Sequence, residues 1–226
     1  MLLSEISYMI MEQLRSYRLV DDEEMDIRLI NDWVKMKRAD ILKNKANSGC
    51  KLNLNNMQTM EVTVSRNATN STAQNVYPFT TLTEQDYFFY KSTTKIPTIL
   101  WTSSGPLIYE IASSDGMKLP YSFGSHSRLR FAGNGRFNTD LIFAAIDTDR
   151  YLYMSDNTYL TADSKVLLKA VFEDPTDVPT FNVATDEFPC SLDVMEAIKL
   201  SVFDKDFRVA LNSKEDINAN DADDQN

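Results

Sequence analysis

The stretch at residues 20–45, "VDDEEMDIRLINDWVKMKRADILKNK", begins with acidic residues, ends with basic ones and spaces apolar residues at helical intervals between them. Acidic side chains are favoured in the first turn of a helix and basic ones in the last, because the helix dipole is positive at its N-terminus. Asp21 or Asp22 can cap the start. An apolar stripe, interrupted at Lys37, comprises Leu29, Ile30, Trp33, Val34, Ile41 and Leu42. The stretch therefore predicts a long amphipathic helix.

The preceding residues carry the same kind of pattern. Apolar side chains recur three and four residues apart at Leu2, Leu3, Ile6, Met9, Ile10 and Leu14. This spacing places them on one face of a second amphipathic helix. The acidic run "RLVDDEE" separates the two helices, and such a short connection predicts an antiparallel helical hairpin.

The apolar period changes from 3.6 to 2 after "NSGC" at residues 47–50. "KLNLNNMQTMEVTVSRN" alternates in part and is rich in Thr and Val, as strands are. Between residues 79 and 172, short apolar runs are separated by "ASSDG", "GNG", "DTDR" and "ADS". Short strands joined by tight turns predict an antiparallel meander or a small sandwich.

Helical spacing returns in "SLDVMEAIKLSVF". Ser191 is a candidate cap, and the predicted apolar face holds Leu192, Met195, Ile198 and Val202. We expect this face to pack on the N-terminal hairpin. The predicted class is α+β: a bundle of the N-terminal helix pair and the C-terminal helix (residues 1–48 and 186–211), and a central antiparallel β domain with loops (49–185). Residues 212–226 predict an acidic flexible tail, because they have too little apolar surface to fold alone.

Composition excludes some functions. The formal net charge is −10, from 23 Lys and Arg against 33 Asp and Glu. Proteins that grip nucleic acid do so with clustered Lys and Arg, so this chain is not expected to, although DNA could slide past it. No apolar run approaches the ~18 residues that span a bilayer. The first residues lack the basic start and cleavage site of a signal peptide.

The candidates for chemistry are isolated. His126 is the one histidine, and no nucleophile-elbow pattern accompanies it. "GNGRF" lacks the residues of a phosphate-binding loop and fits a hairpin turn. Asp147 and Asp149 lie between two apolar strands, which favours a solvated turn over a metal site. We therefore predict no catalytic, cofactor-binding or metal-ligating residues, no cofactor and no enzymatic activity.

The remaining special residues favour structural roles. Cys50 and Cys190 are far apart in sequence and have no metal-ligand spacing around them, as expected of free thiols. "YFFY" at residues 87–90 could stack bases or sugars. It has no interleaved basic residues, which favours packing in the core or at a subunit contact.

Three stretches resemble known proteins. The opening "LLSEISYMIMEQLRSYRLVDDEEMDIRLINDWVKMKRADILKNK" is similar to the N-terminal helix pair of the head-to-tail connector, or ring, proteins of short-tailed bacteriophages, and in particular of the crAss-like phages of Bacteroides. "KVLLKAVFEDPTDVP" is similar to that family's strand with a following Phe-Glu-Asp/Asn-Pro. "FPCSLDVMEAIKLSVFDKDFRVAL" is similar to its Pro-led closing helix.

The resemblance implies a virion structural protein without an active site. Family members form rings, typically of twelve copies, beneath the portal, extend the DNA channel and join the portal to later tail proteins. The implied partners are other copies of the chain, the portal protein and other ring or tail proteins. DNA would pass without specific binding, no membrane would be involved, and assembly would take place in the cytoplasm of the bacterial host.

An alternative function also fits part of the sequence. A carbohydrate- or receptor-binding β module of a virion would use exposed aromatic residues, such as Trp101 and the "YFFY" group. It leaves the helix pair without a role. A hydrolase would need a nucleophile and a base, and no such constellation is evident in the sequence.

Overall fold

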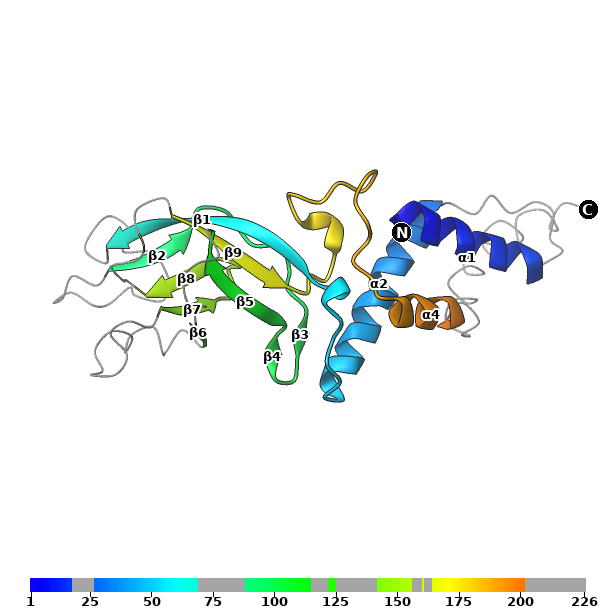
Figure 1. Cartoon of the computed structure of the whole chain (residues 1–226), viewed down its shortest axis with the longest axis horizontal. Coiled ribbons are helices and arrows are strands. Elements are labelled where there is room, and N and C mark those ends of the chain that lie inside the picture. The colour runs from blue at the N-terminus through cyan, green and yellow to red at the C-terminus, as the bar shows by residue number, and fades with distance from the viewer. Residues whose placement is uncertain are drawn as a thin grey trace, which may run out of the picture. The chain divides into compact units, whose positions relative to one another are not determined.

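The computed structural model of the chain describes residues 1–17, 27–68, 88–114, 122–124, 142–155, 160 and 164–201. The chain divides into two compact units (Figure 1). Met1–Asn56 and Phe181–Asn226 form the helical unit, and Met57–Thr180 forms the strand unit. The strand unit is thus inserted between two segments of the helical unit. The described helices and strands confirm the predicted α+β class.

The predicted helix pair is confirmed as α1 (Leu3–Tyr17) and α2 (Ile27–Asn47), which contact each other. Over residues 3–13, the part of α1 whose side chains are described, the buried ones are Leu3, Ile6, Ser7, Ile10 and Met11. Between the helices the Ser7 hydroxyl donates a hydrogen bond to Asn31 Oδ1 at 2.5 Å. The predicted caps Asp21 and Asp22 lie outside the described residues.

The buried face of α2 differs from the predicted stripe. Its buried side chains are Ile30, Val34, Arg38, Ala39 and Leu42. Leu29, predicted to be in the stripe, is exposed, and Trp33 is only half-buried. Positions four apart lie nearly above one another on a helix, so the row that starts at Ile30 passes through Arg38. The predicted apolar stripe was interrupted at Lys37. The buried face of the structure instead continues through Arg38.

Helix α2 ends in a Schellman motif. Gly49 has a φ of 78°, in the left-handed region that favours glycine. The backbone N–H of Gly49 donates to the carbonyl of Ala46, and that of Cys50 donates to the carbonyl of Lys45, both at 3.0 Å. These bonds satisfy carbonyls that the end of a helix leaves unpaired. The motif explains why the helical period stops at "NSGC".

Helix α4 (Leu192–Ser201) contacts α2 (Figure 1), as predicted for the C-terminal helix. Its buried side chains are Val194 and Ile198. Leu192, predicted to face the bundle, is 65% exposed, and Val202 lies outside the described residues. An ion pair between Lys45 and Asp193 also links α2 to α4.

The ion pair predicts a pH effect on stability. The hydrogen bond from Lys45 lowers the pKa of Asp193 to about 2, below its value of about 3.9 in an unfolded chain. A lowered pKa stabilises the folded protein above pH ~4, and this contribution is lost as the pH falls towards 2. Since the Asp193 side chain is 61% exposed, the effect should be small and weaker in high salt.

We therefore expect Asp193→Asn to unfold slightly more easily than the wild type at pH 7, with the two curves converging below pH ~2. Denaturant unfolding across this pH range measures the difference. Asp40→Asn is the matched control, because it removes an exposed carboxylate from α2 in place of the one on α4. A difference that is the same at pH 7 and pH 2 would contradict the assignment to Asp193 ionisation.

The strand unit is built on a seven-stranded sheet in the order β5-β9-β1-β2-β8-β7-β6, with a separate β3-β4 hairpin. The bounds are β1 Gln58–Ala68, β2 Phe88–Ser92, β3 Trp101–Thr102, β4 Gly105–Pro106, β5 Ile108–Ser113, β6 Ser122–Phe123, β7 Phe143–Ile146, β8 Leu152–Ser155 and β9 Ser164–Ala170. Two short 3₁₀ turns, η1 (Leu54–Asn56) and η3 (Pro175–Asp177), lie in the helical and strand units respectively.

Alternate side chains of β1 and β9 are buried and form the core of the sheet. Met60, Val62 and Val64 of β1 are buried, and Glu61 between them is exposed. Their partners on β9 are buried too: Leu168 lies opposite Met60 and Val166 opposite Val62, and Ala170, opposite Gln58, is also buried. On the exposed side Glu61 pairs with Lys165 at 2.6 Å. The period of two that predicted strands therefore marks one buried face.

The strand order differs from that of a simple meander. The hairpin β7-β8 forms across "DTDR" as predicted, but β9, the last described strand, pairs with both β1 and β5. Described neighbours are antiparallel except β6 and β7, which are parallel. The edge strands β5 and β6 also contact each other, so the sheet curls into a nearly closed barrel. Closure of this kind leaves few unpaired strand edges.

Candidate functional site

Among the described residues, no group of three or more His, Cys, Asp or Glu side chains could hold a metal ion. His126 and the "GNG" turn lie outside the described ranges. No helix in the described part of the chain is both long and apolar enough to cross a membrane.

The turn residues Asp147 and Asp149 serve the β7-β8 hairpin. The Arg150 N–H donates to the carbonyl of Asp147 at 2.9 Å and closes the turn. The Asp149 carboxylate accepts hydrogen bonds from the Tyr151 N–H at 3.1 Å and the Tyr153 hydroxyl at 2.6 Å. Burial, together with this bond to Asp149, raises the pKa of Tyr153. The predicted turn at "DTD" is confirmed, but Asp147 and Asp149 are half-buried and not fully solvated.

Two aromatic residues of the "YFFY" group are buried. They are Phe89 and Tyr90, and the centre of the Phe89 ring lies 6.1 Å from the centre of the Tyr153 ring. The Lys91 ammonium lies 4.0 Å from the centre of the Tyr151 ring and 3.8 Å from the Asp149 carboxylate. Packing is thus confirmed for Phe89 and Tyr90, which cannot offer their rings to a ligand.

Trp101 lies on the β3-β4 hairpin and is 54% exposed. It pairs with Pro106, and the Thr102 hydroxyl donates to the Gly105 carbonyl at 2.9 Å. The base of the hairpin is anchored because Leu100 donates its N–H to the carbonyl of Val171 at 2.9 Å. A large aromatic side chain held outward by a short, braced hairpin is suited to binding another molecule.

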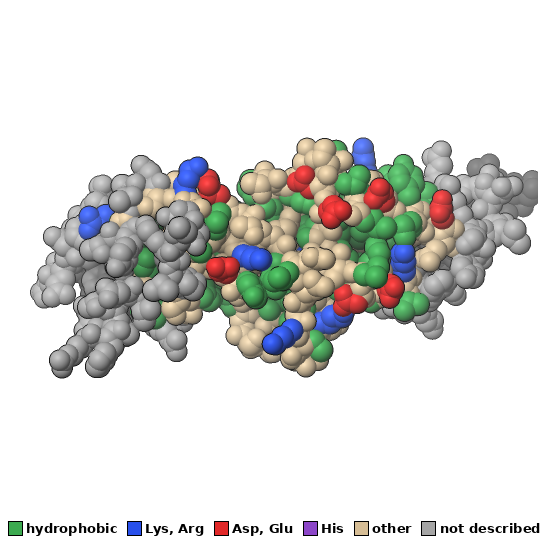
Figure 2. Space-filling view, viewed as in Figure 1, with side chains coloured by type: hydrophobic (Ala, Val, Ile, Leu, Met, Phe, Trp, Pro, Cys, Tyr) green, Lys and Arg blue, Asp and Glu red, His purple; other side chains and the backbone are tan. Residues whose placement is uncertain are grey.

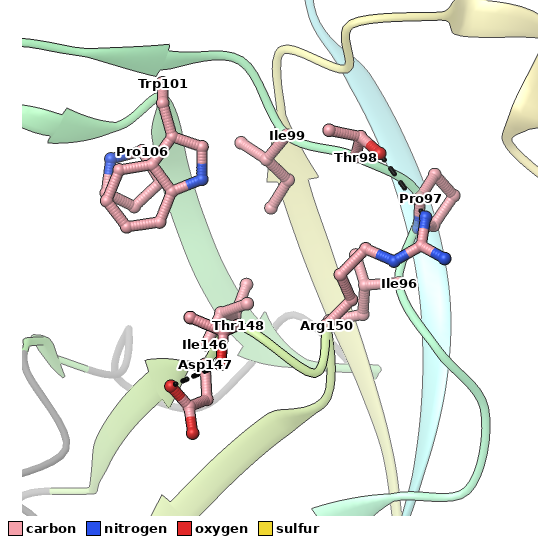
Figure 3. A pocket seen from close by; sticks show the side chains of 10 residues that line it. All are labelled: Ile96, Pro97, Thr98, Ile99, Trp101, Pro106, Ile146, Asp147, Thr148 and Arg150. Atoms are coloured by element: carbon pink, nitrogen blue, oxygen red, sulfur yellow. Dashed lines mark hydrogen bonds between the residues drawn. The ribbon is translucent and has the colours of Figure 1, made fainter.

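The Trp101 ring forms one wall of a cavity of about 230 Å³, which we call the Trp101 pocket (Figure 3). The pocket is lined by Ile96, Pro97, Thr98, Ile99, Trp101, Pro106, Ile146, Asp147, Thr148 and Arg150. Arg150 has a φ of 64°, a region that non-glycine residues seldom adopt. Its carbonyl accepts from the Ile96 N–H at 2.8 Å, which helps to hold this conformation. The pocket is mainly apolar, and its charged lining residues are Arg150 and Asp147.

Apolar side chains also reach the surface of the helical unit, among charged ones (Figure 2). The large exposed hydrophobic residues of this unit are Met1, Tyr8, Leu29, Met36, Leu54, Val183, Leu192 and Leu200. Leu192 and Leu200 lie eight residues apart on α4 and are 65% and 70% exposed. Single exposed leucines are common, but two on one short helix indicate a contact surface.

Arg38 is fully buried at the centre of the helical unit. Its Nε donates to the carbonyl of Pro189 at 2.7 Å, and its Nη2 donates to the carbonyl of Asn56 at 2.8 Å. The Phe188 ring lies 5.6 Å from the guanidinium carbon. One side chain of α2 therefore holds both the 3₁₀ turn before the strand unit and the segment before α4.

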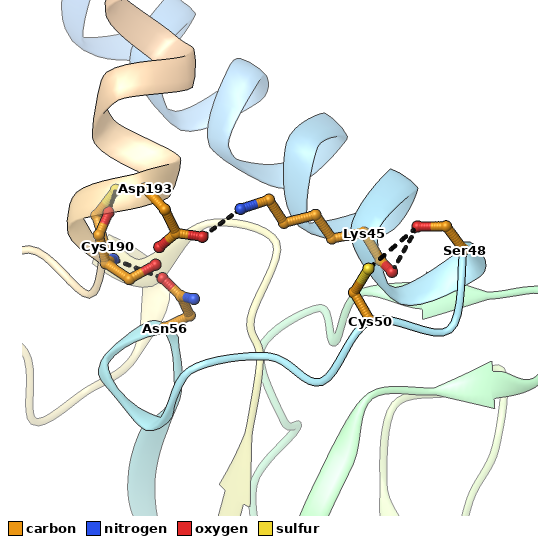
Figure 4. A network of polar contacts seen from close by, with 7 residues as sticks. Lys45, Ser48, Cys50, Asn56, Cys190 and Asp193 are labelled. Carbon is orange, nitrogen blue, oxygen red and sulfur yellow. Dashed lines mark hydrogen bonds and ion pairs between the residues drawn. The ribbon is translucent and has the colours of Figure 1, made fainter.

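Asn56 extends this network (Figure 4). Its buried side-chain Oδ1 accepts the backbone N–H of Ser191 at 2.6 Å, directly before α4 begins. The Ser191 carbonyl in turn accepts from the N–H groups of Val194 and Met195. The start of α4 is thus fixed to the end of the first helical segment through hydrogen bonds between residues far apart in sequence.

The two cysteines have different surroundings (Figure 4). Cys50 is exposed at the end of α2. Cys190 is half-buried, its thiol donates to the Ser191 carbonyl at 3.6 Å, and burial raises its pKa to about 11. Since thiolate is the reactive form, Cys190 should react slowly at neutral pH.

We therefore expect a disulfide reagent at pH 7.5 to label one thiol quickly and the second only when the protein unfolds. Cys50→Ser should remove the fast phase, and Cys190→Ser should leave it unchanged. Absorbance of the released thiolate follows both phases. Two equivalents reacting at the same rate in the folded wild type would show that Cys190 is more accessible than its burial indicates.

The sequence did not indicate that Arg38 holds a buried network of hydrogen bonds. It also did not indicate that Trp101 and Arg150 line the same pocket. A local signal existed only for the hairpin, in "TSSGP" after Trp101, and for the turn that ends at Arg150. The Trp101 pocket is assembled from segments around residues 96–101, 106 and 146–150. The partners of Arg38 lie 18 and 151 residues away along the chain.

One known protein family matches nearly the whole chain. A family model described as phage tail ring protein 2 matches residues 5–225. No curated protein matches the sequence. The match includes the helices, the sheet and the segments between them, and it agrees with the resemblance seen in the sequence.

Proposed function

Because the chain belongs to the crAss phage tail ring protein 2 family, we propose that its copies close into a ring that extends the DNA channel below the portal. Family membership makes it a structural component of the virion tail and not an enzyme. The ring would join the portal to later tail proteins. The family match over residues 5–225 is the observation that carries this proposal.

The surfaces described above support self-assembly. A closed ring needs two different contact surfaces on every copy, because each copy meets one neighbour on each side. The helical unit exposes apolar side chains on α4, and the strand unit exposes Trp101 beside an apolar pocket. In this proposal the helical unit, including the predicted ranges 1–48 and 186–211, forms a rigid wedge. The strand unit, within the predicted range 49–185, supplies further contacts.

The proposed partners are twelve or so copies of the chain, the portal protein and other ring or tail proteins, brought together in the host cytoplasm. DNA would pass through the centre without being bound. A net charge of −10 supports this, because a negative wall repels the phosphate backbone.

The mass of the full chain under native conditions tests ring formation. Mass photometry of the protein, alone and with the portal protein, should show a species at about twelve times the monomer mass. A species at six, ten or eleven times that mass would correct only the copy number. A chain that stays monomeric at every concentration, with and without the portal protein, would contradict the proposal.

We also expect only weak affinity for duplex DNA. At ~150 mM salt, binding should be undetectable at micromolar protein, because the charge of the chain opposes it. Fluorescence anisotropy of a labelled duplex measures this, and a basic DNA-binding protein serves as the positive control. Submicromolar binding would show that the Lys and Arg residues gather on one surface.

A further inference from the structure

We propose that neighbouring subunits are joined by a ridge on α4 of one copy, formed by Leu192, Glu196 and Leu200, which binds in the Trp101 pocket of the next copy. The inference rests on the proposed function, because it assumes that copies associate side by side.

The pocket is suited to an aliphatic side chain next to a carboxylate. Its walls are mainly apolar, with Ile99 between Trp101 and Arg150 (Figure 3). Arg150 forms no ion pair with any described residue, and its Nη1 makes one long hydrogen bond, to the Thr98 hydroxyl at 3.4 Å. The other charged lining residue, Asp147, accepts from the Thr148 hydroxyl at 3.5 Å. Arg150 is therefore available to a carboxylate from outside, and guanidinium groups bind carboxylates well.

The ridge has the complementary chemistry. Leu192, Glu196 and Leu200 are spaced four residues apart, so they lie along one face of α4. All three are exposed, while Val194 and Ile198 are buried. Glu196 has no ion-pair partner within the described part of the chain. The ridge thus presents a carboxylate between two leucines.

The spacing of the ridge fits the arrangement of the pocket. Residues four apart on a helix have Cβ atoms about 5–6 Å from each other. A leucine that enters the cavity beside Ile99 therefore places Glu196 one helical turn away, within reach of an arginine at the edge. Burying the leucine and Trp101 excludes water, which strengthens the pairing of the two charges.

Other exposed residues of the helical unit fit less well. Met36 follows Lys35 and precedes Lys37, and positive charge on both sides would repel Arg150. Tyr8 lies one turn from Glu5, whose carboxylate already accepts the Leu2 N–H at 2.8 Å. Of these surfaces, the α4 ridge alone combines exposed aliphatic side chains with a carboxylate that has no ion-pair partner among the described residues.

Charge exchange tests the pairing on the full-length chain. Arg150→Glu and Glu196→Arg should each weaken self-association about tenfold or more, because like charges then meet at the contact. The double variant should recover most of the loss, since it restores an opposite pair. Lys43→Glu and Glu173→Arg reverse exposed charges outside both surfaces and are the matched controls. Mass photometry or sedimentation velocity across a concentration series, with and without the portal protein, gives the association constants.

Two neutral variants test the apolar part of the contact. Trp101→Ala and Leu192→Ala should weaken association about as much as the single charge reversals, while circular dichroism shows unchanged folding because both side chains are exposed. Rings that form normally in both single charge variants would overturn the inference and leave the proposed function standing. Loss of assembly without recovery in the double variant would also overturn it. A wild type that never self-associates would contradict the proposed function, and the inference with it.

Discussion

Replacing Arg38 with methionine should lower the unfolding free energy of the helical unit by about 2–5 kcal/mol, because two buried carbonyls lose their donor and each unpaired group costs about 1–3 kcal/mol. Methionine has a similar volume, so the change mainly removes the charged donor. The carbonyls of Pro189 and Asn56 would then lie buried without the hydrogen bonds that they now accept at 2.7 and 2.8 Å. Unpaired buried polar groups are costly because nothing replaces the water that they lost on folding.

The two tryptophans allow this effect to be measured in one unit at a time. Trp33 is in the helical unit and Trp101 in the strand unit, and the chain has no others. In a Trp101→Phe background, Trp33 fluorescence reports unfolding of the helical unit. Arg38→Lys, which keeps the charge but loses the guanidinium fork, should have an intermediate effect. Lys43→Met, at an exposed position of α2, is the control. A loss under ~1 kcal/mol in Arg38→Met would contradict the role given to the network.

Phe172→Ala should lower the unfolding free energy of the strand unit by about 3–5 kcal/mol. Phe172 is fully buried and its backbone bridges to Ile99. On either side of it, Val171 and Glu173 bond to Leu100 and Thr98, both at 2.9 Å. A cavity at Phe172 would thus lie next to the segment that leads to Trp101.

Trp101 fluorescence in a Trp33→Phe background measures this loss. The emission of Trp101 should also change before global unfolding, because the base of its hairpin loses a packing partner. Tyr109→Ala, which shortens an exposed side chain on β5, should change stability by less than ~1 kcal/mol and serves as the control. Equal effects of the two substitutions would show that Phe172 contributes little to the core.

Local patterns predicted the elements that depend on neighbouring residues. The helices α1, α2 and α4 follow from apolar spacing, and the end of α2 at Gly49 follows from a glycine that adopts a left-handed conformation. The alternation on β1 and the "DTDR" turn were also visible in the sequence. Each of these features is decided by residues within a few positions of one another.

Features that depend on distant residues could not be predicted in the same way. Arg38 was not predicted to be buried, since a charged residue is rarely buried unless distant groups satisfy its donors. The face of α4 was misassigned at Leu192, because both faces of that short helix carry apolar residues and only packing against α2 selects between them. The position of β9 between β1 and β5 likewise depends on pairing across long separations. The Trp101 pocket depends on the same tertiary arrangement.

The insertion of the strand unit between two helical segments also sets an order of events during translation. The ribosome makes α1 and α2, then all of Met57–Thr180, and only then α4. At bacterial elongation rates of roughly 5–20 residues per second, the interval is on the order of ten seconds. During that time Arg38 lacks the carbonyl of Pro189, and the nascent chain has no α4 to offer to a neighbour. Prematurely released chains would therefore lack both a complete helical unit and the α4 ridge that we propose joins neighbouring copies.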